Sequence, residues 1–227
     1  MDTPLTVTEI QADPARIATR SYAKSGSILT FRPLIQEDAP QLGRYFLGLS
    51  EQTKRKYAPH PFDQAIADDL CARIDYADTV RMIAVLQGET QEEVIAYFIL
   101  QLNVPPYEIE RYAQAGVTLD PKKDCLIAPS VADSYQNQGI GGPLMGHVAR
   151  IASRLGFRHL LLMGGVYCDN AQAVRFYQKN GFKTVSTFMP NWANARLSFD
   201  MMINLDLGEI PNSVGRSYTR QEHLGVT

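Results

Sequence analysis

The chain has 227 residues, of which 45% are apolar, and this is enough to bury the core of one large domain. Its formal net charge is −2, from 22 basic and 24 acidic residues, and no basic run stands out. Such a balance creates no field that would gather nucleic acid or an anionic membrane surface, so we expect neither as a partner.

Residues 1–26 are polar and interrupted by proline and glycine, and we interpret them as an extension before the core. Asp2 and Glu9 lie among them without a continuous apolar stretch, which fits neither a secretory signal nor a transit peptide. We therefore expect a cytoplasmic protein. The folded domain is expected over residues 27–206, and residues 207–227 are interpreted as a polar C-terminal tail.

The first part of the domain is predicted to contain a strand, two helices and a β-hairpin, from the spacing of its apolar residues. These elements cover residues 28–34, the stretches after Asp38 and Asp63, and the runs 82–86 and 94–102. The longest apolar run, residues 94–100, is much shorter than the roughly 20 residues that a membrane span needs. No membrane span is expected.

The second part of the domain alternates strands and helices. Strands are predicted at 126–131, 159–166, 182–188 and 197–205, with helices after residue 142 and over 170–180. The first of these helices carries Leu144, Val148, Ile151 and Leu155 at helical spacing, so one face should pack on a sheet. The whole order predicts an α/β fold with a mixed sheet.

A glycine-rich loop joins the strand ending at Val131 to the helix that follows. Glycine lets the main chain approach a ligand closely, and a helix start presents unpaired N–H groups, so the loop suits a pyrophosphate. Leu144 stands where a dinucleotide fingerprint needs its third glycine, and the lysine with serine or threonine of a nucleotide P-loop is absent. The loop is also consistent with a purely structural tight turn.

A second pattern lies on the helix over residues 170–180. Asn170, Ala173 and Tyr177 are spaced at i, i+3 and i+7, so they share one face over two turns. Taken alone, Asn170 is equally a helix cap and Tyr177 a core aromatic with a polar edge. The three cysteines and four histidines show no spacing of metal ligands, and no metal site is expected.

Together, the two patterns resemble the Gcn5-related N-acetyltransferase (GNAT) superfamily. The resemblance rests on Gln-x-x-Gly-x-Gly from Gln136 and on Asn-x-x-Ala-x-x-Phe-Tyr-x-x-x-Gly-Phe from Asn170, and it covers about residues 28–205. It implies the GNAT fold, a mixed and mostly antiparallel sheet of about six to seven strands flanked by about four helices. It also implies acetyl-CoA as co-substrate.

The resemblance assigns roles to residues of both patterns. Val131 would meet the pantetheine and thioester through its main chain, Asn170 and Ala173 would line the other wall, and Tyr177 would face the sulfur as a catalytic hydrogen-bond donor. The pyrophosphate would bind main-chain N–H groups of the loop formed by Gln136, Asn137, Gln138, Gly139, Ile140, Gly141 and Gly142. Asn137 and Gln138 replace the family's more usual glycine and basic residue, which leaves less positive charge near the phosphates.

The implied reaction is acetyl transfer by direct attack of a primary amine, without a covalent enzyme intermediate. A small-molecule amine is the favoured acceptor, a protein amine is the alternative, and a homodimer stays open. Many family members carry a glutamate on the strand before the loop, but here only Asp124 at its head is a candidate base. Glu51, His60 and Glu110 are weaker candidates, and residues 54–56 are interpreted as a solvated basic helix face.

Two alternatives to this function remain. The first alternative is a non-catalytic acyl-CoA-binding or sensing module. The second is an enzyme of the same fold that uses a longer acyl group. The segment 103–124 is too long for an ordinary hairpin loop and is interpreted as a functional lid or a disordered insert. If it is functional, we expect Tyr107, Glu110 and Tyr112 beside the acceptor cleft.

Overall fold

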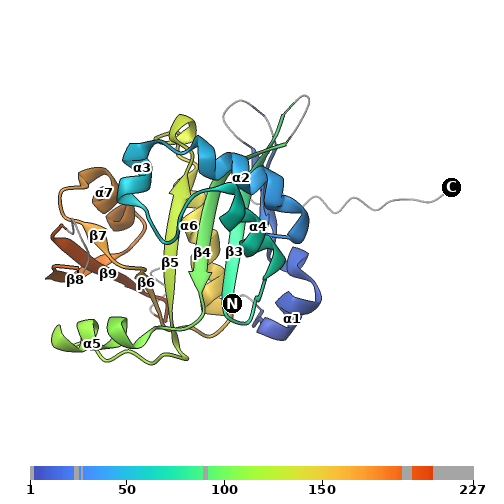
Figure 1. Cartoon of the computed structure of the whole chain (residues 1–227). Coiled ribbons are helices and arrows are strands. Elements are labelled where there is room, and N and C mark those ends of the chain that lie inside the picture. The colour runs from blue at the N-terminus through green and yellow to red at the C-terminus, as the bar shows by residue number, and fades with distance from the viewer. Residues whose placement is uncertain (1–2, 23–25, 27, 89–91, 191–195, 207–227) are drawn as a thin grey trace.

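A mixed sheet forms the centre of the molecule (Figure 1), shown here in a computed structural model that describes residues 3–22, 26, 28–88, 92–190 and 196–206. Within these residues nine strands are ordered β1-β2-β3-β4-β5-β6-β9-β7, with β8 paired to β9. Of the strand pairs described, only β5 and β6 run parallel. The strands are β1 (Thr19–Tyr22), β2 (Ile28–Pro33), β3 (Thr79–Gln87), β4 (Glu92–Gln101), β5 (Asp124–Val131), β6 (His159–Leu162), β7 (Val166–Tyr167), β8 (Lys183–Phe188) and β9 (Ser198–Asn204).

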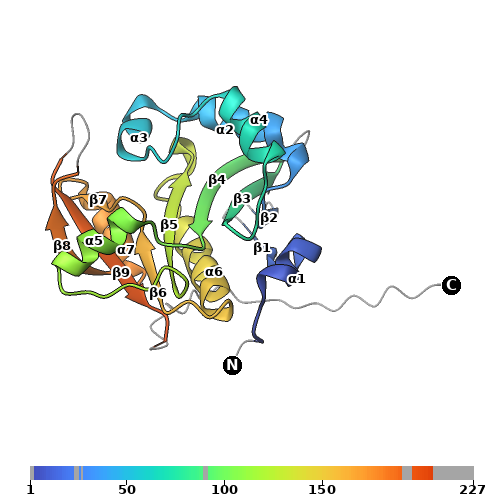
Figure 2. The same ribbon diagram turned by 60° about the horizontal axis from the view of Figure 1, so that its bottom comes forward.

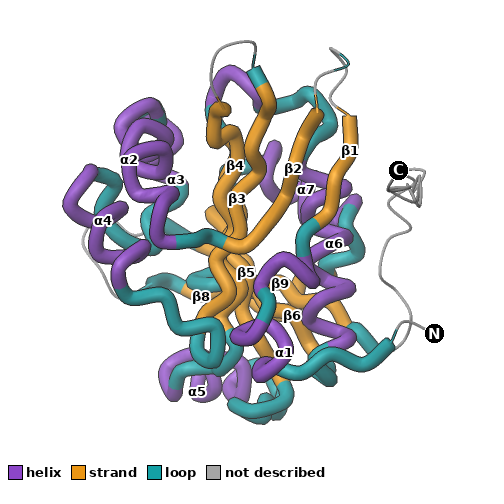
Figure 3. The backbone as a smooth tube through the Cα atoms, turned by 90° about the vertical axis from the view of Figure 1, so that its right-hand side faces the viewer, coloured by secondary structure: helices purple, strands orange, loops and turns teal. Residues whose placement is uncertain are grey.

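Helices cover both faces of the sheet (Figure 3). One face carries α2 (Ala39–Gly48), α3 (Glu51–Lys56) and α4 (Gln64–Ala72), and the other carries α1 (Val7–Ala12), α6 (Gly141–Arg154) and α7 (Ala171–Lys179). Along β3, Met82 and Ala84 are buried in the core with α6, while Ile83 and Val85 are buried with α2 and α4. This alternation follows from the two-residue period of a strand.

The predicted mixed, mostly antiparallel α/β architecture is confirmed, and the strand count is somewhat higher than expected. Part of the difference lies in the predicted strand 159–166, which is divided into β6 and β7. Gly164 and Gly165 separate the two at φ of 68° and 72°, a region that favours glycine. The turn they form places the intervening main chain beside the site described below.

The long helix α6 is formed as its apolar spacing predicts. Leu144, Val148 and Ile151 are buried against the sheet, and Leu155 is the C-cap residue. Gly156 follows at φ of 85° and ends the helix. None of the described helices is long and apolar enough to cross a membrane.

The N-terminal segment differs from its interpretation as an extension outside the core. Ile10 and Ile17 are 0% and 1% exposed in the same core as α6, and β1 pairs with β2. Leu5 N also donates a hydrogen bond to Arg154 O over 2.9 Å. Much of the segment therefore packs on the domain, although its short elements give too few repeats to show a period in sequence. The predicted tail, residues 207–227, lies outside the described residues.

A gap opens between the two parallel strands. β5 pairs with β4 from Leu126 to Val131, but it pairs with β6 only from Asp124 to Ile127. Beyond Ile127 one edge of β5 is therefore not covered by β6. The gap lies between the loop that precedes α6 and the turn that follows β6, which brings both chain segments to one place.

Candidate active site

The main chain of β5 points into this gap. Ala132 N donates to Ile95 O over 2.8 Å, which fixes the phase of the antiparallel ladder between β4 and β5. Because alternate residues of such a ladder bond in opposite directions, the main-chain groups of Val131 and Pro129 point away from β4 and into the gap. Pro129 is accommodated there because the ladder to β4 does not need its missing N–H donor.

A cavity of about 1350 Å³ lies over the gap; its lining includes Phe98, Leu162 and residues 127–130, together with two further sets of residues. We call the first set the glycine-loop half, and it consists of Val131, Asp133, Tyr135, Gln136, Asn137, Gly139, Ile140, Gly141, Gly142, Asn170, Gln172, Ala173, Arg175, Phe176, Tyr177 and Lys179. We call the second the side-chain half, and it consists of residues 52, 53, 55–59, 107, 111, 163–167 and 188–190. The volume is sufficient for a large, elongated ligand.

In the glycine-loop half, the main chain adopts a conformation that few residues tolerate. Asn137 and Gly139 have φ of 61° and 82°, and asparagine is one of the few side chains found in that region. Among the described residues, no side chain caps the start of α6, so its first N–H groups remain available for an anion. Gln136 Nε2 donates to Val131 O over 3.1 Å, which ties the loop to the end of β5.

Two loop residues also have structural contacts of their own. The side chain of Gln138 turns back to donate to Ser134 O over 2.7 Å, and Gln138 does not line the cavity. At Gly141, an added Cβ would stand 3.0 Å from the Phe176 ring and 3.9 Å from Val131 Cγ2. A close approach of α6 to α7 is therefore a structural reason for glycine there, beside the expected approach to a ligand.

The wall formed by α7 joins the two sequence patterns. Asn170 caps the helix by accepting from Ala173 N over 3.4 Å, and both residues also line the cavity. Gln172 Nε2 donates to Asn137 Oδ1 over 3.1 Å and so links α7 to the glycine loop. The capping and ligand-lining roles that were alternatives for Asn170 in sequence are therefore compatible.

Tyr177 lies on the inner face of the same helix and lines the cavity. Its ring packs edge-on against Phe176 and Phe182, with centroid distances of 5.3 and 5.5 Å. Burial raises the pKa of Tyr177 well above its ordinary value, so the hydroxyl stays protonated at neutral pH. It is able to donate a hydrogen bond to charge that forms in the cavity.

A second tyrosine faces the cavity from the side-chain half, and the sequence patterns did not indicate it. Tyr57 follows α3 and donates its hydroxyl to Ala128 O over 3.1 Å, with its ring stacked on Phe62. Burial raises the pKa of Tyr57, so its hydroxyl stays protonated at neutral pH. Tyr57 and Tyr177 both line the cavity.

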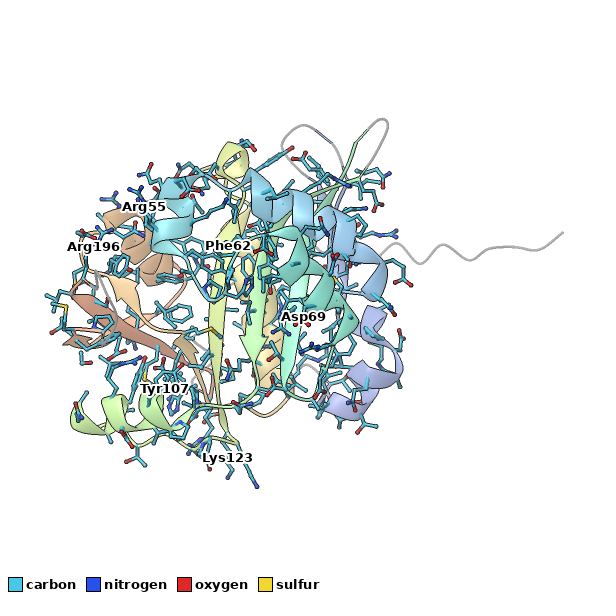
Figure 4. The ribbon with its side chains drawn as sticks, viewed as in Figure 1. Arg55, Phe62, Asp69, Tyr107, Lys123 and Arg196 are labelled. Atoms are coloured by element: carbon cyan, nitrogen blue, oxygen red, sulfur yellow. The ribbon has the colours of Figure 1, made fainter. Side chains whose placement is uncertain are left out.

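Several cations line the cavity. Arg55 and Lys56 belong to the basic stretch that was interpreted as a solvated helix face; both are exposed, and both line the side-chain half. Arg175 and Lys179 on α7 line the glycine-loop half. Figure 4 shows Arg55 on α3 and Tyr107 on α5 (Pro106–Gln114), two elements far apart in sequence that contribute to one cavity.

Asp124 is not placed to act on a ligand in this cavity. It is completely buried at the opposite end of β5 from Val131, with one carboxylate oxygen 2.9 Å from His159 Nδ1 and the other 3.3 Å from Arg158 Nη2. The carboxylate also accepts from Asp120 N over 2.7 Å. Its role is to hold the start of β5, and our expectation of a base there is corrected.

The weaker base candidates also lie outside the cavity lining. Glu51 pairs with Lys54, Glu110 is exposed, and His60 Nε2 contacts the Tyr97 hydroxyl at 3.3 Å. Among the described residues, Asp133 is the one carboxylate that lines the cavity. Burial opposes its ionisation, but hydrogen bonds from Ser50 and Thr53 lower the pKa of Asp133 overall, which makes it a poor base.

The segment 103–124 is structured and packs beside the cavity. Its helix α5 lies against β8 and β9 (Figure 2), and Tyr107 and Arg111 line the side-chain half. Tyr112 instead points into the core, where its hydroxyl donates to Met201 O over 3.3 Å. Arg111 was not among the residues expected there. Within the described residues, no group of three histidine, cysteine or acidic side chains is arranged to hold a metal ion.

Comparison with known proteins gives one family and a consistent set of solved structures. The GNAT domain of S. lividans PAT has a TM-score of 0.60 at 18% identity, covering 84% of this chain and 98% of its own. The aminoglycoside acetyltransferase AAC(6')-Ib in complex with coenzyme A and kanamycin has a TM-score of 0.57 at 17% identity, covering 78% of this chain and 94% of its own. A putative phosphinothricin N-acetyltransferase has a TM-score of 0.57 at 16% identity, covering 78% of this chain and 98% of its own.

A search among curated proteins found no match to this sequence. The model of the Acetyltransferase (GNAT) family matches residues 49–182, more than half of the chain. The match includes both sequence patterns and the strand between them. The chain therefore belongs to the GNAT acetyltransferase family.

Proposed function

We propose that the protein transfers an acetyl group from acetyl-CoA to a primary amine. The observation that supports this most strongly is that the glycine loop, the exposed edge of β5 and Tyr177 meet in one cavity. The loop supplies N–H groups for the pyrophosphate, and Val131 supplies main-chain groups for the pantetheine and thioester. Asn170 and Ala173 form the facing wall.

The proposed chemistry is a direct transfer. The amine nitrogen forms a bond to the acetyl carbonyl carbon, the carbon–sulfur bond breaks, and its electron pair leaves on the CoA sulfur. Tyr177 donates a hydrogen bond to the developing thiolate, which needs a protonated hydroxyl and so agrees with its raised pKa. With Asp133 too weak a base, the amine proton passes to water in the open cavity and the thiolate is protonated in turn.

The names of the solved relatives point to small amine acceptors, an aminoglycoside in one case and phosphinothricin in another. We propose a small-molecule amine for this chain, with a protein amine as the alternative. A cytoplasmic location agrees with the supply of acetyl-CoA that the proposed reaction needs. A non-catalytic acyl-CoA sensor would share the cavity but would have no use for a donor at the sulfur.

The test is release of free thiol from acetyl-CoA, followed across a panel of primary amines. We expect release with at least one amine, and acetyl-CoA at 100 times its Kd should stabilise the fold by about 2.7 kcal/mol. Stabilisation without thiol release for any amine would support the sensor and overturn the enzyme. No stabilisation by CoA, together with stabilisation by NAD or ATP, would move the function to another ligand.

A further inference from the structure

A group of charged residues beside the cavity holds one arginine in a fixed orientation. Glu108 on α5 and Asp200 on β9 are both fully buried, and Arg111 lies between them. Arg111 Nη2 donates to Glu108 Oε2, and Arg111 Nε donates to Asp200 Oδ1 over 2.9 Å. The other carboxylate oxygens accept from Gly164 N over 3.1 Å and from Ser186 Oγ over 2.7 Å. Each carboxylate is therefore fixed from two sides.

This arrangement presents the guanidinium group to the cavity. The central carbon of Arg111 lies 4.0 Å from the centroid of the Phe188 ring, and 15% of its side chain is exposed. Within the described part of the chain, Arg111 Nη1 has no hydrogen-bond partner, although the residue lines the cavity. A guanidinium held in this way loses little freedom on binding a ligand, and its planar donors match a carboxylate.

Among the described residues, three cations and no carboxylate belong to the lining of the side-chain half, with Glu108 and Asp200 behind Arg111. Arg55, Lys56 and Arg111 line it, while both oxygens of Asp133, the nearby carboxylate, are occupied by Ser50 and Thr53. A polycationic acceptor such as an aminoglycoside would meet repulsion in this part of the cavity.

We propose that the acceptor is an amine that also carries a carboxylate, and that Arg111 binds this carboxylate while the amine reaches the thioester. The proposal rests on the proposed acetyltransferase function and names the acceptor class for that site. Arg111 then determines specificity without taking part in the chemical step. Glu108, Asp200 and Phe188 position it.

The experiment compares matched acceptors that differ only in the carboxylate, such as an amino acid and the amine formed from it by decarboxylation. Pairs with two to six bonds between nitrogen and carboxyl carbon sample the distance from Arg111 to the thioester. We expect kcat/KM at least tenfold higher for the carboxylated member of the best pair. Equal rates, or faster transfer to the amine without the carboxylate, would overturn the proposal.

Arg111→Lys keeps a positive charge and removes the planar fork, so the buried carboxylates retain a counter-ion. We expect it to lower kcat/KM at least tenfold for the carboxylated acceptor while leaving the paired amine and acetyl-CoA unaffected. The matched control is Arg196→Lys, because Arg196, labelled in Figure 4, also lies over an aromatic ring, Tyr167, and pairs with a carboxylate, Asp169. Arg196 is not among the described residues that line the cavity. Equal loss for both acceptors in Arg111→Lys would reduce Arg111 to a structural role and overturn the proposal.

Equilibrium binding to the CoA-bound protein separates this inference from the proposed function. Arg111-dependent binding of the carboxylated acceptor without thiol release would contradict the enzyme but support the carboxylate site. Thiol release with amines that bind independently of Arg111 would support the enzyme and overturn the carboxylate site.

Discussion

The glycine-loop half of the cavity offers mainly main-chain groups, and the side-chain half offers mainly side chains. In the first half, the loop before α6 and the start of α7 come from two short stretches of chain, joined by the Gln172 to Asn137 hydrogen bond. In the second half, Tyr57 reaches Ala128 across 71 positions, and Arg111 reaches Asp200 across 89. Main-chain donors do not depend on residue type and suit a ligand that all members of a family share. Side chains can be exchanged, so they allow a second ligand to differ between relatives.

Under the proposed function, this difference would separate co-substrate binding from acceptor choice. Changes in the glycine-loop half should affect acetyl-CoA whatever the amine, and changes in the side-chain half should affect the amine alone. Tyr177 belongs to the glycine-loop half but is proposed to donate to the sulfur, so its removal should affect the chemical step itself. Four variants or conditions test this division, from the largest expected effect to the smallest.

Tyr177→Phe should give the largest effect. Removing a donor that acts on transition-state charge typically costs about 3 kcal/mol, or a factor of roughly 10²–10³ in turnover. Acetyl-CoA affinity should stay unchanged because the ring still packs against Phe176 and Phe182. Steady-state turnover and equilibrium titration with CoA measure the two quantities. A rate equal to that of the wild type would show that water or another group stabilises the thiolate.

Gly141→Val should weaken CoA binding at least tenfold, about 1.4 kcal/mol, with any acceptor. The added side chain would push on the Phe176 ring, which an ideal Cβ already approaches to 3.0 Å, and so would displace the start of α6. Gly48→Ala is the matched control, since an added Cβ there meets no atom within 4 Å. Unchanged affinity in a folded Gly141→Val protein would place the phosphate site elsewhere.

Tyr57→Phe should affect the side-chain half only. Losing the hydrogen bond to Ala128 O should cost about 1 kcal/mol of unfolding free energy and raise KM for the acceptor, with KM for acetyl-CoA unchanged. Tyr135→Phe is the control for stability alone, because its hydroxyl donates to Glu93 at an exposed site and its loss should change the free energy of unfolding by less than about 0.5 kcal/mol. A rise in KM for acetyl-CoA alone in Tyr57→Phe would contradict the division into halves.

Acidification should give the smallest and most gradual effect. Burial lowers the pKa of His60 and of His147, so below about pH 6.5 the unfolded chain binds protons that the folded chain excludes. The free energy of unfolding should therefore decrease as the pH is lowered, by at most about 1.4 kcal/mol per pH unit for each histidine. Chemical denaturation at several pH values measures the slope.

The two histidines also differ in their surroundings. The His60 ring lies 5.1 to 5.8 Å from the rings of Phe46, Phe62 and Tyr97, next to the loop that carries Tyr57. His147 instead bonds Ile17 O over 2.8 Å, away from the cavity. We expect His60→Gln and His147→Gln each to reduce the slope of stability with pH, and only His60→Gln to change the acceptor KM at pH 6. An unchanged slope in the double variant would show that other groups control it.

The sequence by itself determined most elements of the domain and the glycine-loop half. The period of Leu144, Val148 and Ile151 is a local property, and so is the spacing of Asn170, Ala173 and Tyr177 on one helix face. A site formed by the main-chain groups of neighbouring residues can be recognised from a local sequence pattern. For this reason both patterns could be identified from the residues, and their resemblance to the GNAT superfamily joined the loop and α7 into one candidate site.

Only the tertiary structure showed which residues form the side-chain half and that the acidic base candidates lie outside the cavity lining. Asp124 is a plausible base in sequence, but its burial against His159 and Arg158 depends on strand pairing that no local pattern reveals. No local sequence pattern marks Arg111 or Tyr57, because their roles arise from contacts with residues far along the chain. Such contacts follow from which elements pack together, and packing is a property of the whole fold.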